Sequence, residues 1–247
     1  MALTRGKMTK DTIYIYDDEV GRVQLVENSG TDLTVVNSAR VSFGVEKSTL
    51  DERDRKLIDY LVKNRHTSTL EHCNVTFKFV VPLYVRSQHH RHRTWSYNEI
   101  SRRYTSVDMK FYEPKSFRTQ HETNRQASNS DKINPNINDC GVKTTIPVSA
   151  YYASDAVKWH HVKSLGLYED LVSRGVCREQ ARGVLPQNLY TEYYGTVSLL
   201  NALKFIDLRD HDGAQWEIQQ VAKAMLEFLS ELYPVTVESY KKHRQGG

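Results

Sequence analysis

Two periodicities in the first hundred residues predict two kinds of element. Apolar and polar residues alternate over residues 73–81, which indicates a half-buried strand whose inner face carries Val75, Phe77, Phe79 and Val81. Residues 12–16 are also β-prone and predict a strand. Residues 49–52 (TLDE) match a capping box, and apolar residues at helical spacing follow as far as Asn64. We therefore expect strand, helix and strand in this order.

Pro82 suits the first turn of a helix, so we expect a helix over residues 82–93. Its spacing would place Gln88, Arg91 and Trp95 on one face. Ser96 and Glu99 are spaced as a capping box, which predicts a further turn. Residues 115–146 are rich in Asn and other polar residues with few apolar ones, and we interpret them as a long surface excursion rather than a domain boundary.

The pattern from Pro147 to the end is helical. One helix is expected to stop at Gly175, with an inner stripe of Val157, Val162, Leu165, Tyr168 and Leu171. Two more are expected over residues 199–208 and 216–233, the second closed by Pro234. Strands that precede helices favour an α+β fold. We predict one domain over residues 1–247, with a small, mostly antiparallel sheet, flanking helices and a helical C-terminal half.

Composition excludes several classes of protein. The chain has 247 residues, and its net charge of +4 is modest, so any strong basicity is local. No apolar run is long enough to span a membrane, and residues 1–11 lack the apolar stretch of a secretion signal. The three cysteines form no C-x-x-C pair, which suits a reducing compartment, so we expect a cytoplasmic protein. No G-x-G or phosphate-binding loop is present, so side chains must bind any nucleotide.

Residues 91–104 (RHRTWSYNEISRRY) carry the main functional signal. They contain four arginines and one carboxylate, Glu99. Unpaired buried charge is costly, so the segment is either a solvated basic face or a site for phosphates, which arginine binds through two parallel hydrogen bonds. The interleaved Trp95, Tyr97 and Tyr104 also fit a platform for single-stranded nucleic acid. Composition alone leaves these alternatives open.

The order of residues in this segment is more specific. Arg91-His92-Arg93, seven residues and then Ser101 resembles the signature of the flavin-dependent thymidylate synthases. The fuller match is RHR-x-x-S-Y-N-E-x-S-x-R-Y, and similar segments occur at residues 52–60, 66–72, 178–191 and 214–220. The likeness spans most of residues 30–234 apart from the excursion.

The resemblance implies roles for particular residues. Arg209 would stabilise negative charge on the uracil ring, and Ser101 would position the substrate. Cofactor-binding positions would be Ser68, Glu71, Arg91, His92, Arg93, Glu99, Ser198 and Lys204. Substrate-binding positions would be Gln88, His89, His90, Arg91, Glu99, Ile100, Ser101, Arg102, Arg103, Arg182 and Arg209.

The activity implied by the resemblance is a methyl transfer. dUMP would be reductively methylated to dTMP, with methylenetetrahydrofolate as one-carbon donor and hydride passed from NADPH through FAD. The flavin would lie at a subunit interface of a homotetramer, and neither a membrane nor a nucleic acid is an expected partner. Arg102, Gly213, Lys204 and the segment 198–200 (SLL) depart from the family pattern. They favour as an alternative a related flavin- and folate-dependent modification of a pyrimidine nucleotide, such as hydroxymethylation.

Metal and thiol chemistry have weaker support. His66, His72, His89, His90 and His92 lie near Cys73, but no pair has the spacing of a zinc site, so we expect no metal. The flavin-independent thymidylate synthases use a cysteine in a Pro-Cys-His context, and Cys73, Cys140 and Cys177 all lack it. We expect Cys73 to serve in packing.

Overall fold

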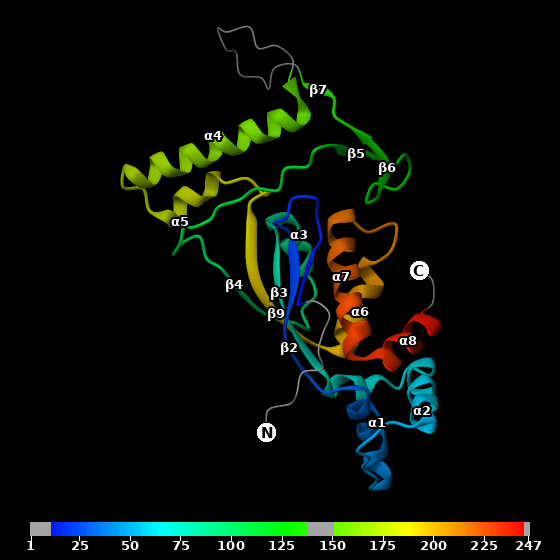
Figure 1. Cartoon of the computed structure of the whole chain (residues 1–247). Coiled ribbons are helices and arrows are strands. Elements are labelled where there is room, and N and C mark those ends of the chain that lie inside the picture. Colours follow the sequence, from blue (N-terminus) through cyan, green and yellow to red (C-terminus); the bar gives the residue numbers. More distant parts are fainter. Residues whose placement is uncertain (1–10, 138–150, 245–247) are drawn as a thin grey trace.

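A five-stranded antiparallel sheet lies at the centre of the computed structural model, which describes residues 11–137 and 151–244 (Figure 1). The order of its strands is β1-β2-β3-β9-β4. Their bounds are Thr12–Tyr14 (β1), Arg22–Ser29 (β2), Asn74–Pro82 (β3), Tyr190–Ser198 (β9) and Ser96–Glu99 (β4). Neighbouring strands are antiparallel throughout, so the predicted α+β class with a mostly antiparallel sheet is confirmed.

The strand β3 confirms the alternation found in the sequence. Val75, Phe77, Phe79 and Val81 are all 0 % exposed, and they face the helical layer and its aromatic side chains. The ring of Phe77 lies 5.9 Å from that of Phe228, which belongs to helix α7 (Trp216–Leu232). This cross-layer packing explains why β3 occupies the middle of the sheet.

The strand β9 corrects the prediction that the chain is helical from Pro147 onward. It pairs with β3 over nine residues, from Asn74 opposite Ser198 to Pro82 opposite Tyr190. Its residues, YTEYYGTVS, are rich in β-branched and aromatic side chains, which favour strands. Gly195 in β9 gives Phe79 and Trp95 room, because a Cβ there would lie 3.0 Å from the first ring and 3.1 Å from the second.

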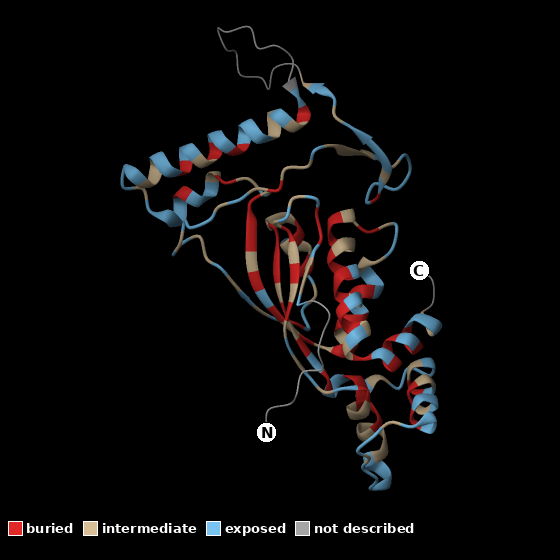
Figure 2. Ribbon diagram, viewed as in Figure 1, coloured by how far each residue is buried: buried red, intermediate tan, exposed pale blue. Residues whose placement is uncertain are grey.

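Two C-terminal helices pack beside the sheet (Figures 1 and 2). Helix α6 (Leu199–Arg209) and α7 match the predicted ranges, and both bury one apolar face. Pro234 ends α7 as expected, but it also begins helix α8 (Pro234–His243), which was not predicted. The carboxylate of Asp32 caps α8 by accepting from the backbone N–H groups of Val235 and Thr236, both at 2.9 Å.

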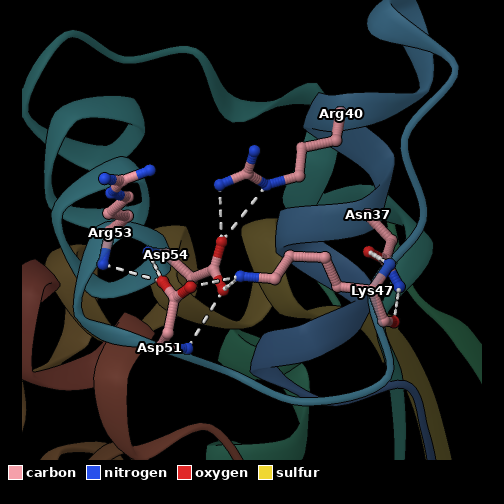
Figure 3. Close-up of polar contacts among 6 residues, drawn as sticks. All are labelled: Asn37, Arg40, Lys47, Asp51, Arg53 and Asp54. Carbon is pink, nitrogen blue, oxygen red and sulfur yellow. Dashed lines mark hydrogen bonds and ion pairs between the residues drawn. The ribbon is translucent and has the colours of Figure 1, made fainter.

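A buried carboxylate joins helices α1 (Asp32–Arg40) and α2 (Glu52–Lys63), as Figure 3 shows. The Asp54 side chain is fully buried. Its carboxylate accepts hydrogen bonds from Arg40 Nη2 at 2.6 Å and from Lys47 Nζ at 2.5 Å. Asp51 is the N-cap of α2, since its side chain accepts from the backbone N–H groups of Arg53 and Asp54. The cap therefore lies two residues after the predicted Thr49, because the aspartate at 54 completes the capping box.

The described part of the excursion contains a hairpin. Strands β5 (Phe117–Gln120) and β6 (Ser128–Ile133) pair with each other, and β7 (Asn136–Ile137) pairs with β8 (Tyr151–Tyr152). The predicted remainder of the excursion, residues 138–146, lies outside the described residues. The hairpin lies beyond the N-terminal end of α7 (Figure 1), where Arg118 of β5 donates a hydrogen bond to Glu217.

Helix α4 (Ala153–Ser173) lies across the far end of the sheet from α1 and α2 (Figure 1). It confirms the predicted stop, because Gly175 follows it with a φ of +89°. The predicted inner stripe is partly wrong, since Val162 is 70 % exposed. Tyr168 is buried and packs with Ala181, Leu185 and Leu189 in a second small core. Within the described ranges, no helix is both long and apolar enough to cross a bilayer.

Candidate active site

The arginine-rich segment, residues 91–104, follows helix α3 (Leu83–His89) and contains strand β4. The helix is shorter than the predicted 82–93, so Trp95 lies beyond its end and does not share its face with Gln88. The predicted turn at Ser96 and Glu99 is β4 instead, paired with Thr196 to Tyr193 of β9. Residues 96–99 are extended because they pair with β9, a strand that was not predicted.

A cavity of about 570 Å³ opens between α3, β4 and residues 179–191. It gathers five of the predicted site residues, which are Glu99, Ile100, Ser101, Arg102 and Arg182. It also contains side chains that were not predicted to bind ligand, including Arg86, Gln187 and Thr191. The edge of the sheet thus brings segments that are far apart in the sequence into one hollow.

Glu99 is fixed in this cavity by two side chains. Thr191 Oγ1 donates to Glu99 Oε1 at 2.6 Å, and Arg86 Nε lies 3.2 Å from the same oxygen. Glu99 Oε2 has no partner among the described residues. One carboxylate oxygen is therefore held by the protein, and the other is available to accept a hydrogen bond from a ligand.

The arginines around the cavity differ in their partners. Arg102 donates from Nη1 to the carbonyl oxygen of Val107 at 2.8 Å, and burial lowers its pKa. Arg103 is half-exposed and pairs with Glu179 at 3.4 Å. The guanidinium of Arg182 has no partner among the described residues and lines the cavity. Arg182 is consequently the cation best placed to take a ligand's phosphate.

His89 occupies the interior instead of the cavity. It is 1 % exposed, and its ring is enclosed by Phe79, Trp95 and Phe205. Its Nδ1 lies 2.7 Å from the Tyr193 hydroxyl, and burial holds its pKa well below the usual value. This position contradicts the prediction that His89 contacts substrate, because no ligand can reach the ring.

The neighbouring aromatic residues also change one hypothesis. Trp95 is buried, and its ring stacks on Tyr97 with centroids 5.9 Å apart. The ring of His90 lies 4.1 Å from that of Tyr97, so His90 too is partly enclosed. Bases cannot stack on a buried tryptophan, so Trp95 does not form the nucleic-acid platform that its position in the sequence allowed.

Arg209 and His92 form a second part of the site at the C-terminal end of α6. Arg209 Nε donates to His92 Nε2 at 3.1 Å, which requires a neutral imidazole that is unprotonated at Nε2. Burial, and then the nearby Arg209 cation, lower the pKa of His92 to about 4. Arg91 and Arg93 flank His92, both exposed and without side-chain partners in the described ranges.

Three of the four remaining predicted cofactor residues line two hollows. Glu71 and Ser198 line a groove of about 350 Å³ together with Ser96 and Asn201. Lys204 lies in a pocket of about 660 Å³ between α2, α6 and α8. Ser68 is exposed on the 3-10 helix Thr67–His72 that leads to Glu71.

Most of the chain matches one protein family. Residues 24–235 match the family described as thymidylate synthase complementing protein (Thy1). A flavin-dependent thymidylate synthase of Thermus thermophilus is 41 % identical over 225 residues, which cover 90 % of this chain and 76 % of the relative. The chain belongs to the flavin-dependent thymidylate synthase family.

Other relatives agree with this family assignment. A flavin-dependent thymidylate synthase of Thermotoga neapolitana is 37 % identical over 227 residues, covering 92 % of this chain and 94 % of the relative. The UMP/dUMP methylase PolB of Streptomyces cacaoi, solved with 5-Br UMP, superposes with a TM-score of 0.73 at 30 % identity. That comparison covers 91 % of this chain and 95 % of the methylase. The structure with 5-Br dUMP gives a TM-score of 0.74.

Two residues of this synthase-family chain were missed as parts of the site. Thr191 was within a matched segment, but only the pairing of β9 with β4 reveals its contact with Glu99. Gln215, the second residue of the matched segment 214–220, accepts a hydrogen bond from the Gln88 side chain. The position of Gln215 in the matched segment AQWEIQQ could have indicated a role in the site. The segment alone does not show that Gln215 contacts Gln88.

Neither of the two described cysteines lines the cavity. Cys73 is buried at the start of β3, and burial raises the pKa of its thiol to about 12. Cys177 is exposed next to α5 (Arg178–Ala181), and Cys140 lies outside the described residues. Among described residues, no group of His, Cys, Asp and Glu is arranged to hold a metal ion.

Proposed function

We propose that this protein reductively methylates dUMP to dTMP. Methylenetetrahydrofolate supplies the one-carbon unit, and FAD, reduced by NADPH, is the redox cofactor. The observation that supports this activity best is the arginine-lined cavity in which Glu99 is fixed, since the last three residues of the family signature, Glu99 to Ser101, line it.

The cavity suits a nucleotide monophosphate. Arg182 and Arg102 lie in its wall and offer guanidinium donors to a phosphate, while Ser101 adds a hydroxyl. Glu99 Oε2 is an acceptor for an N–H or O–H of the base or sugar. A volume of about 570 Å³ is within the usual range for a small-molecule site.

The residues outside the cavity suit a flavin nucleotide. A flavin dinucleotide carries a diphosphate, and Arg91 and Arg93 present two unpaired, exposed guanidiniums beside His92. The groove with Glu71, Ser96, Ser198 and Asn201 offers hydroxyl, amide and carboxylate groups to a sugar or ring edge. These side chains could bind a flavin dinucleotide without a glycine-rich loop, which the sequence lacks.

Arg209 provides electrostatic stabilisation in the proposed reaction. Carbon 5 of uracil is a weak nucleophile, and loss of the N3 proton, which places negative charge on the ring, makes it a stronger one. His92, held neutral, accepts from Arg209 Nε and leaves both Nη groups available to that charge. When bound, the flavin supplies the two electrons that bring the transferred carbon to the methyl level.

We further propose that the active protein is a homotetramer in which neighbouring chains complete the flavin site. Arg91 and Arg93 are exposed in the single chain, although each is expected at the cofactor. Phe43 is 81 % exposed at the tip between α1 and α2, and Trp159 is half-exposed on α4. Val41, 73 % exposed, lies on the same turn as Phe43, and contiguous exposed apolar side chains are typical of surfaces that are covered in an assembly.

Purified protein tests the activity directly. Incubated with dUMP, methylenetetrahydrofolate and NADPH under low oxygen, the wild type should form dTMP, while Arg209→Ala should not. A yellow preparation whose flavin bands shift on addition of dUMP would agree with the proposed cofactor. Absence of both product and bound flavin would refute the proposal.

Arg102 favours a second candidate, a related modification of a pyrimidine nucleotide such as hydroxymethylation. Its side chain lies in the cavity wall, at a position where the resemblance implies a small residue. A large cation there changes the shape and charge of the substrate site. Mass spectrometry of the product formed from dUMP separates a methyl group from a hydroxymethyl group.

A further inference from the structure

A chain of side-chain hydrogen bonds joins the hairpin β5–β6 to helix α3. Arg118 of β5 donates from Nη2 to Glu217 Oε1 at 2.7 Å. Gln215 Nε2 donates to Glu217 Oε2 at 2.9 Å, and Gln88 Nε2 donates to Gln215 Oε1. The order Arg118–Glu217–Gln215–Gln88 crosses from the hairpin to the start of α7 and then to the end of α3.

The hairpin end of this chain is firmly held. The Glu217 side chain is 6 % exposed, and a carboxylate so buried needs a charged partner. Arg118 supplies that charge, and its guanidinium lies over the Trp216 ring at 5.0 Å. Its Nε also donates to Ser128 Oγ on β6 at 3.0 Å. Both strands of the hairpin therefore contribute to placing Arg118.

The chain fixes the orientation of two amides. A carboxylate accepts only, so Glu217 requires the NH₂ group of Gln215 to face it. The Gln215 oxygen then faces Gln88, which in turn must direct its own NH₂ group toward Gln215. The oxygen Oε1 of Gln88 is left without a partner among the described residues and is an acceptor for a ligand.

We propose that Arg118 is a positioning residue through which hairpin β5–β6 orients Gln88 for the nucleotide. Gln88 Oε1 accepts a hydrogen bond from an N–H or O–H of the pyrimidine nucleotide, and the charge pair of Arg118 and Glu217 determines which end of the amide is presented. This inference rests on the proposed function and on the family resemblance, which implies that Gln88 binds the substrate. It gives the excursion a role in substrate binding although the hairpin does not line the cavity.

Arg118→Met separates this role from simple anchoring, because methionine keeps an unbranched side chain at this position and removes the hydrogen-bond donors and the charge. We expect the Kd of dUMP for the flavin-loaded protein, measured by calorimetry, to rise roughly three- to tenfold, the range of one lost hydrogen bond. Arg118→Lys keeps the charge and should restore most of the affinity. Arg125→Met, at an exposed arginine of the same hairpin, should bind dUMP as the wild type does.

A double-mutant cycle tests whether Arg118 acts through Gln88. Gln88→Ala alone should weaken dUMP binding, and the double variant Arg118→Met/Gln88→Ala should bind no more weakly than Gln88→Ala. A double variant whose Kd rises by the product of the two separate fold-changes would overturn the inference, since the residues would then act independently. Thermal unfolding of each variant identifies any loss caused by unfolding.

Two further outcomes are distinguishable. Wild-type protein that binds no dUMP would overturn the proposed function and this inference with it. Wild-type and Arg118→Met proteins that bind dUMP equally well would overturn the inference alone. If Arg118→Met does not fold, Glu217→Gln serves instead, because a neutral amide no longer dictates the orientation of Gln215. We expect that variant also to weaken dUMP binding, and unchanged affinity would count against the inference.

Discussion

The cavity and the open face around His92 are both rich in arginine, but they satisfy their charges differently. Arg86 in the cavity wall pairs with Glu99, and Arg103 beside the cavity pairs with Glu179. On the open face, Arg91 and Arg93 are exposed and have no side-chain partners among the described residues. The cavity is therefore organised by the single chain, whereas the open face requires a ligand or another chain to neutralise it.

The difference shows how one basic segment serves two purposes. Arginines that pair with protein carboxylates hold a fixed shape, and they leave Arg182 and Glu99 Oε2 for the substrate. Unpaired arginines keep all of their guanidinium donors available for an anionic cofactor, and water solvates these donors until the cofactor binds. Variants on each side should therefore affect different ligands.

The largest effect is expected for Arg209→Ala. This change removes the guanidinium that faces the proposed charge on the ring, so kcat should fall by about 100-fold or more, as for loss of an oxyanion donor. The fold should survive, because Arg209 is only partly buried and its side chain donates to His92 at the end of α6. Steady-state kinetics and thermal unfolding together check this, and a nearly normal kcat would remove Arg209 from the mechanism.

Arg91→Ala should weaken cofactor binding on the open face. The side chain has no partner among the described residues to lose, so any effect reports a ligand contact, and one charged hydrogen bond corresponds to roughly a 10- to 100-fold change in Kd. The absorbance ratio of flavin to protein measures the loss. Arg174→Ala, at an exposed arginine paired with Asp170 at the end of α4, is the matched control and should keep its flavin.

Arg182→Ala should have the opposite selectivity. We expect the Kd of dUMP to rise by about tenfold, because a charge-assisted contact to phosphate is lost in the cavity. Flavin content should stay at the wild-type level. Equal losses of flavin and dUMP in this variant would mean that the two regions are one site and would break the comparison.

Thr191→Val tests how the cavity holds Glu99. Valine has the shape of threonine without the donor to Glu99 Oε1, and Thr191 is only 5 % exposed, so solvent cannot replace it. The KM for dUMP should rise by about two- to tenfold with little change in stability. Thr191→Ser keeps the hydroxyl and should stay close to the wild type; if serine and valine behave alike, the hydrogen bond does not position Glu99.

The smallest effect is expected from pH. The pKa of His92 is about 4 in the folded protein and about 6.5 when unfolded, so the unfolded chain takes up the proton first as the pH falls. The free energy of unfolding should therefore decrease between about pH 6.5 and pH 4. The buried His89 shifts in the same direction. Thermal unfolding across this range should show a shallower slope for His92→Gln than for the wild type.

The elements predicted with success are those whose own residues carry the signal. The period-2 alternation in β3 and the helical stripes of α6 and α7 report which face is buried, and that face is the same in the folded chain. The order of residues in the segment 91–104 also identified the family before any contact was known. Local pattern and motif were sufficient for these features.

The strand β9 was missed although its composition favours a strand. Tyr190–Ser198 lies between segments that resemble family helices, and that neighbourhood outweighed its β-branched and aromatic residues. Because β9 was not predicted, Ser96–Glu99 was predicted as a turn. These residues form a strand because they pair with β9. Strand pairing is a non-local choice, so one segment's pattern cannot reveal it.

The sequence by itself determined the α+β class, the family, the concentration of arginine and the residue types that bind nucleotides. Only the tertiary structure decided which of those residues act together. It placed Thr191 against Glu99, buried His89 away from any ligand, and linked Arg118 to Gln88 through Glu217 and Gln215. The reason is that charges and hydrogen bonds depend on distances across the sheet and between layers, and residues far apart in the sequence acquire those distances only when the chain folds.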